Sequence, residues 1–428
     1  MRSSKLAHLA PEWLLTYAAV ILLIAVLVNL FASFAQHSYS LTIPSIRDDE
    51  HGLGLSYTEV TLLVTVVSAA KMGASFGSGT LAPRYGVRPM IGIGTIVSGA
   101  AMFLLGFAPN FYLALAATAL MGVGSGAALT PMMGLLAPWF SGRNRGVAAG
   151  LASTGASIGF VITGLMVPWL VKQSPDDGWR VTWFIFGGLT LAIGVLTVVF
   201  VHDRTGRTSE ASSEAATGAA TGRKAVGAWP LVALKSPFVW LVTLLAFCAG
   251  WSLGIFTSLF GAYLSAENDI DLVVTGRLLV LIGVLSVGSG ALWGGVSDRA
   301  GRGTAFLLVG LVQGIAFALF WLVPGMVVFV VSSVLIGLTL RAAYVICAAS
   351  AGDYVPVHFA GAAFGLMSTG ASLGLTISPV VGGMMADTVG MSWAFSLALA
   401  ASVVATGAGA LLHHMTGSSR SVMAELVR

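Results

Sequence analysis

An arginine lies in the middle of a long apolar segment, where its charge could bind a ligand. No other charged residue occurs between Arg302 and Asp353, and Arg341 lies among the apolar residues between them. A guanidinium keeps its proton in proteins, and a charge at membrane depth normally faces a watery cavity or a partner. Arg341 is therefore a predicted substrate-binding residue. Tyr344 shares its helix face and would bind a substrate oxygen or orient the guanidinium. Alternatively, Arg341 braces two helices or caps backbone carbonyls.

A second cation, Lys71, lies within another apolar segment, between Ala70 and Met72. Serines occur three residues before it and four and seven residues after it, at positions that share its helix face. This spacing predicts a polar stripe on a cavity wall, with Lys71 binding substrate. The alternative is a lysine that extends along the helix to the membrane head groups.

A third polar pattern lies in the first apolar segment. Asn29, Ser33, Gln36 and Ser40 are separated by four, three and four residues, which places them on one helix face. Polar side chains at membrane depth indicate a cavity, so we expect this face to bind substrate as well. His37 lies beside the stripe and could carry a coupling proton near neutral pH. Alternatively, it is a neutral hydrogen-bonding residue between helices.

The acidic residues point to the charge of the ligand. No Asp or Glu lies midway along any apolar segment, and Glu59, Asp353 and Asp387 fall at segment ends. The membrane cations therefore lack an anionic partner, which a carboxylate ligand would supply, and arginine binds carboxylates through two hydrogen bonds. No metal-ligand cluster, cofactor motif or nucleophile–base pair is present. We expect no metal, no cofactor and no enzymatic activity.

The elements that must position these residues are membrane helices. The chain has 428 residues, of which 57% are hydrophobic and only 9% charged, a balance that excludes a soluble protein. Nucleic-acid binding is not expected, because the basic residues lie in short loops. Segments of about 20 apolar residues cross a bilayer as helices. Twelve are predicted, over residues 14–43, 57–81, 89–108, 111–138, 145–171, 180–201, 238–264, 272–296, 303–323, 325–351, 360–386 and 391–412.

The loop charges predict how these helices are oriented. With the N-terminus inside, most Lys and Arg residues fall on the inner side, whereas outer loops are acidic, as at Asp48, Asp49 and Glu50. Positive residues favour the cytoplasmic side, so both termini are predicted to be cytoplasmic in a plasma (inner) membrane. The first apolar run is too long for a signal-peptide core and is expected to be a retained helix.

The chain also repeats itself. Gly150–Gly159 reads GLASTGASIG and Gly365–Gly374 reads GLMSTGASLG, and the same offset relates Gly79 to Gly294 and Gly122 to Gly337. A shift of six helices predicts an all-α membrane protein of two pseudo-symmetric six-helix bundles, related by an axis along the membrane normal, with the binding site between them. The predicted units are a bundle over 1–202, a polar cytoplasmic linker over 203–235 and a bundle over 236–428.

These features resemble the major facilitator superfamily over essentially the whole chain. Its loop signature, G-x-L-a-D-R-x-G-R, is similar to residues 294–302, and the copy at 79–88 has Pro83 in place of the acid. The resemblance implies the major facilitator fold, alternating access and a gating role for these loops, through Arg84, Arg88, Asp298, Arg299 and Arg302. The alternative for these residues is a tight turn anchored at the head groups. In this family the first helix of each half lines the cavity, which implies that Trp251 contacts substrate.

Within the superfamily, the chain looks most like porters of small organic anions, of the monocarboxylate and oxalate–formate type. It lacks two patterns of proton-coupled drug exporters, because Thr118 replaces their arginine and the fifth segment has no Gly-Pro-x-x-Gly-Gly run. Cations on the eighth and eleventh helices, frequent in the anion branch, are also absent here except for Arg277 at an edge. The resemblance implies a monomeric secondary active transporter of a carboxylate, coupled to protons or to anion exchange. The alternative is an exporter of drugs or amphiphilic metabolites.

Overall fold

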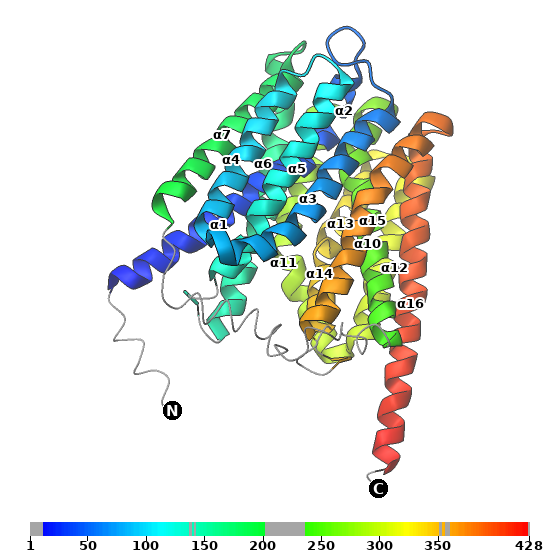
Figure 1. Cartoon of the computed structure of the whole chain (residues 1–428). Coiled ribbons are helices and arrows are strands. Elements are labelled where there is room, and N and C mark those ends of the chain that lie inside the picture. Colours follow the sequence, from blue (N-terminus) through cyan, green and yellow to red (C-terminus); the bar gives the residue numbers. More distant parts are fainter. Residues whose placement is uncertain are drawn as a thin grey trace.

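The computed structural model describes residues 12–136, 139–140, 143–201, 236–350, 353–355 and 360–426. Over these residues the chain is helical and contains twelve spans long and apolar enough to cross a membrane, which confirms the predicted fold class and number of crossings (Figure 1). The predicted linker lies outside the described residues.

The helices form two bundles of six crossings. The first contains α1 (Glu12–His37), α2 (Tyr39–Arg47), α3 (Tyr57–Tyr85), α4 (Val87–Gly106), α5 (Phe111–Leu136), α6 (Arg143–Gln173) and α7 (Gly178–Phe200). The second contains α10 (Pro237–Ala262), the π-helix η2 (Tyr263–Glu267), α11 (Leu272–Ala300), α12 (Arg302–Leu322), α13 (Met326–Thr339), α14 (Ala342–Ser350), α15 (Ala360–Thr388) and α16 (Met391–Leu426).

The start of α1 and the end of α16 lie at the same end of the molecule, which we call the terminal end (Figure 1). The opposite end, which carries the turn after α2 and the turn between α15 and α16, is called the loop end. The sequence repeat is visible in the backbone. Gly86 and Gly301, which are equivalent positions of the repeat, both end a helix at the terminal end with φ near +90° (91° and 92°), a conformation that favours glycine.

Two crossings differ from the continuous helices that were expected. The first is interrupted at Ser38, between α1 and α2, and the tenth is interrupted at Leu340 and Arg341, between α13 and α14. At the second break the neighbouring helix α11 binds the released backbone groups. Ser289 Oγ accepts a hydrogen bond from the Arg341 N–H (3.3 Å), and Trp293 Nε1 donates to the Leu338 carbonyl (2.8 Å). These two side-chain bonds replace helical ones at the break.

Repeated glycines explain how the cavity-lining helices pack. A Cβ at Gly155 of α6 would lie 3.0 Å from the Leu30 nitrogen on α1. A Cβ at Gly370, its equivalent on α15, would lie 2.8 Å from the Thr243 carbonyl on α10. Glycine therefore lets α6 approach α1, and α15 approach α10, more closely than any other residue would allow.

The two bundles meet closely near the loop end. A Cβ at Gly164 of α6 would lie 2.5 Å from the carbonyl of Gly276 on α11. Asp387, at the end of α15, accepts hydrogen bonds from the first N–H groups of α3. Gly261 of α10 donates its N–H to Ser40 Oγ of α2 (3.0 Å). These three helix pairs close the loop end.

Candidate functional site

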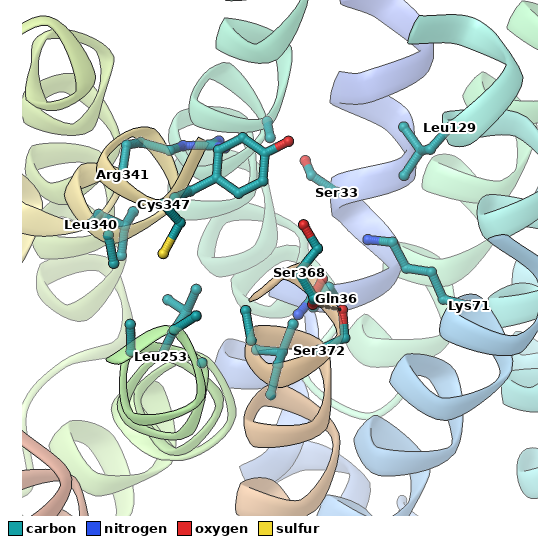
Figure 2. A pocket seen from close by; sticks show the side chains of 18 of the residues that line it. Ser33, Gln36, Lys71, Leu129, Leu253, Leu340, Arg341, Cys347, Ser368 and Ser372 are labelled. Carbon is teal, nitrogen blue, oxygen red and sulfur yellow. Dashed lines mark hydrogen bonds between the residues drawn. The ribbon is translucent and has the colours of Figure 1, made fainter. Parts of the chain in front are cut away.

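A cavity of about 370 Å³ lies between the bundles and is lined by both of them. This volume is at the lower end of the roughly 300–1,000 Å³ of small-molecule sites, which favours a small solute. Its polar lining comes from α1, α3, α12, α14, α15 and the break in the tenth crossing. The polar residues are Asn29, Ser33, Gln36, His37, Lys71, Gln313, Arg341, Tyr344, Ser368 and Ser372 (Figure 2).

Arg341 reaches this cavity from the break between α13 and α14. Its backbone is fixed by the Ser289 hydrogen bond, and its guanidinium Nη2 lies 3.5 Å from Ser157 Oγ on α6. Ser157 also accepts a hydrogen bond from Ser286 on α11 (2.8 Å). Arg341 forms no ion pair with any carboxylate of the described residues. Tyr344 lies one helical turn further on, is 60% exposed and also lines the cavity.

Lys71 lines the cavity from α3, but the serines predicted to accompany it do not. Ser75 and Ser78 each lie within 3.4 Å of the Gly126 carbonyl on α5 and donate to it. Gly122 and Gly126 allow α5 to pack directly on this part of α3, because a Cβ at Gly122 would lie 3.1 Å from the backbone nitrogen of Lys71. Lys71 therefore lines the cavity, whereas Ser75 and Ser78 lie in the contact between α3 and α5.

The polar stripe of the first crossing lines the cavity over three of its four positions, Asn29, Ser33 and Gln36. Asn29 also donates to the Ala152 carbonyl on α6 (3.1 Å). His37 lies at the end of α1, where its ring stacks on Phe160 with centroids 3.8 Å apart. Its Nδ1 is buried and has no hydrogen-bond partner among the described residues.

The seventh crossing reaches the cavity through a different face from the one expected. Its lining residues are Ala246, Ala249, Gly250 and Leu253. Trp251 is not among them, and its ring instead lies beside Phe247 with centroids 5.7 Å apart. This face of α10 is thus apolar, and three of its four lining residues are small.

The predicted gate residues lie at the terminal end. Arg302 forms a short network, with Nη1 2.7 Å from Asp298 and Nε 2.8 Å from Asp353. This network ties α11, α12 and the segment after α14 together within the second bundle. In the first bundle, Arg88 donates from Nε to the Val198 carbonyl on α7 (2.7 Å). The other two predicted gate residues, Arg84 and Arg299, are exposed.

The prediction from sequence omitted several polar residues of the site. Ser368 and Ser372 line the cavity from α15, and Ser157 lies against Arg341 from α6. The repeat contained the signal for them, since Ser157 and Ser372 occupy the same place in GLASTGASIG and GLMSTGASLG. A motif that recurs in both halves at a helix facing the pseudo-symmetry axis predicts paired side chains at the site.

Comparison with known proteins places the chain among transporters. A family model described as Major Facilitator Superfamily matches residues 22–328 and, again, 242–421. The probable sulfoacetate transporter of Cupriavidus necator is 24% identical over 392 residues, covering 87% of both chains. The sialic acid transporter of Escherichia coli is 28% identical, covering 77% of this chain and 78% of its own. The probable L-galactonate transporter of Escherichia coli is 25% identical, covering 93% and 88%.

The solved structures with a similar fold include a bacterial homologue of the human lysosomal transporter Spinster, in an inward-facing and unoccupied conformation. It superposes with a TM-score of 0.75 at 15% identity, over 93% of this chain and 97% of the other. At this identity the likeness concerns the fold alone.

Proposed function

The chain belongs to the major facilitator superfamily and is a multi-pass membrane transporter without enzymatic activity; we propose that it moves a small organic anion, a carboxylate. The observation that carries the proposal is the arginine in the central cavity. Arg341 has no carboxylate partner in the described part of the chain, and no acid lines the cavity. A cation without a counter-charge in a partly desolvated cavity is unfavourable, so a carboxylate ligand would stabilise the site.

The relatives support an anionic substrate. Sulfoacetate, sialic acid and L-galactonate, named for three of them, are all acids that are charged at neutral pH. They differ in size and in the number of hydroxyl groups, so what they share is the anionic group. We infer that Arg341 binds this group and that Tyr344, Asn29, Ser33, Gln36 and Lys71 bind the rest of the substrate.

We propose alternating access between the bundles, with residues 1–202 and 236–428 as the moving units and 203–235 as the linker. We propose that the terminal end is cytoplasmic, because Lys and Arg residues are in excess near it and positive residues favour the cytoplasmic side. The closed loop end then faces outward. We infer that Arg302, with Asp298 and Asp353, and the exposed Arg84 and Arg299 exchange partners when the terminal end closes.

His37 is the proposed proton carrier of a symport cycle. It lies on the same cavity as Arg341 and Lys71, and its Nδ1 has no partner among the described residues that would hold one protonation state. A bound anion makes a charge on His37 more favourable, so that anion and proton bind cooperatively. In His37→Gln, the dependence of uptake on a proton gradient should disappear. If that dependence is unaltered, coupling uses another group or is an exchange of anions.

The experiment that tests the proposed function is uptake of labelled monocarboxylates and dicarboxylates into proteoliposomes. We expect uptake of at least one carboxylate by the wild type and a loss of at least tenfold in Arg341→Gln, with the variant folded by size-exclusion chromatography. Lys172→Gln is the control, since Lys172 is exposed near the loop end. Equal uptake by Arg341→Gln and the wild type would show that Arg341 does not bind the substrate.

A further inference from the structure

The cavity contains two cations that come from different bundles. Arg341 belongs to the second bundle and Lys71 to the first, and both line the same space. Figure 2 shows their side chains approaching from opposite sides, with Ser33, Ser368 and Gln36 between them. Neither cation is in an ion pair with a described residue.

The two cations do not occupy equivalent positions of the repeat. Lys71 lies on the second crossing of the first half, whereas Arg341 lies on the fourth crossing of the second half. The position equivalent to Lys71 in the second half is Ser286, and the position equivalent to Arg341 in the first half is Gly126. Lys71 and Gly126 are in contact in the first bundle, because a Cβ at Gly126 would lie 3.0 Å from the Lys71 carbonyl carbon. Ser286 and Arg341 of the second bundle both donate to Ser157 of the first bundle. Each half therefore supplies one cation and one small residue.

This arrangement has a consequence for the charge of the ligand. A monoanion bound at Arg341 would leave the Lys71 ammonium without a counter-charge in a partly desolvated cavity. A ligand with two anionic groups would neutralise both cations. Arginine suits a carboxylate bound through two hydrogen bonds, and lysine suits a single charge contact.

The rest of the lining fits a short molecule with an anionic group at each end. Hydroxyl and amide groups of Ser33, Gln36, Ser368 and Ser372 lie around the middle of the cavity. Apolar walls are formed by Phe160, Leu253, Leu340 and Phe364. A short hydrocarbon spacer would contact these walls.

We propose that the substrate is a dianion, with one anionic group bound by Arg341 and the other by Lys71, so that it joins the two bundles. This inference rests on the proposed function, since it specifies the anion that the same cavity takes. In this proposal, Lys71 makes the site prefer dianions to monoanions, and Arg341 binds an anionic group of every ligand.

The test compares ligands that differ by one charge and little else. Succinate and its mono-amide, succinamate, have the same number of non-hydrogen atoms. Oxalate, malonate and glutarate vary the spacer. Binding to purified protein in nanodiscs is measured by calorimetry for the wild type, Lys71→Gln and Arg341→Gln, with Lys172→Gln as the surface control. Thermal unfolding without ligand checks that the variants are folded.

In the wild type, we expect at least one dicarboxylate to bind ten times or more tightly than its mono-amide. In Lys71→Gln this preference should fall below threefold, while the mono-amide keeps its affinity. Arg341→Gln should bind neither. Equal binding of the two ligands by the wild type, or a preference that survives in Lys71→Gln, would overturn the dianion inference and leave the anion transporter intact. If no carboxylate binds the wild type, the proposed function and the inference both fail.

Discussion

Replacing Asp387 by Asn should shift the protein toward a state that is open at the loop end. The Asp387 carboxylate accepts hydrogen bonds from Tyr57 N (2.9 Å), Thr58 N (2.7 Å) and Thr58 Oγ1 (2.6 Å). These bonds join the second bundle to the N-terminus of α3 in the first, where the helix dipole also favours a negative charge. Opening the loop end must break all three bonds.

The size of the effect follows from these contacts. A hydrogen bond to a charged group contributes about 1.5–3 kcal/mol when it is buried, and a charge at a helix terminus about 0.3–1 kcal/mol. Asp387 is exposed, so water competes and we take roughly 1–2 kcal/mol for the whole cluster. Asn keeps one acceptor oxygen but replaces the other with an NH₂ donor and removes the charge. The ratio of open to closed molecules should therefore rise about 5- to 30-fold.

Single-molecule fluorescence resonance energy transfer measures the ratio of open to closed molecules, with dyes attached to the cysteines of a Glu50→Cys and Ala266→Cys double variant. Both positions are exposed at the loop end, one in each bundle, whereas the native Cys248 and Cys347 are buried. The matched control is Glu59→Gln, because Glu59 caps the same helix from within its own bundle through the Ser56 N–H (2.9 Å). If Asp387→Asn leaves the distance distribution unchanged, or if Glu59→Gln changes it equally, the contact is not a latch between the bundles.

Two further predictions concern the break in the tenth crossing and the contact between α6 and α11. Trp293→Phe leaves the Leu338 carbonyl without its donor, at a cost of about 1–3 kcal/mol. Carboxylate binding measured by calorimetry should therefore weaken about 5- to 150-fold as Arg341 loses its position, and unchanged affinity would contradict this role. Gly276→Val should stop closure at the loop end, abolish transport and give the open distance distribution, whereas Gly288→Val on the same helix, where a Cβ meets nothing within 4 Å, should transport normally.

The sequence predicted the cavity residues best where a polar side chain interrupts an apolar helix. Arg341, Lys71 and three of the four residues of the stripe in the first crossing line the cavity, because a membrane helix rarely carries such groups toward lipid. Trp251 was predicted to contact substrate, but it does not line the cavity. Its helix is apolar around its whole circumference, so periodicity does not show which face meets the cavity, and the structure uses Gly250 and Leu253 instead.

The helix break in the tenth crossing could not be predicted from the local sequence. The segment around Arg341 contains neither proline nor a cluster of polar residues, and its apolar composition is compatible with a continuous helix. The break is stabilised by Ser289 and Trp293, which belong to a different helix earlier in the chain. Such a tertiary effect overrides local propensity. For the same reason Ser75 and Ser78 bind the Gly126 carbonyl and do not face the cavity.

The two cations also bear on whether the empty carrier can change state. Closing the cavity at both ends without a ligand would bury Arg341 and Lys71 unpaired, at several kcal/mol per ion. A bound dianion removes this cost, so the loaded carrier should change state readily and the empty one slowly. Return of the empty carrier should then limit the rate of net uptake, and exchange of anions should be faster. Lys71→Gln leaves one cation and should raise net uptake relative to exchange. Proteoliposomes loaded with or without internal succinate measure both rates, and an unchanged ratio in Lys71→Gln would show that the cations do not restrain the empty carrier.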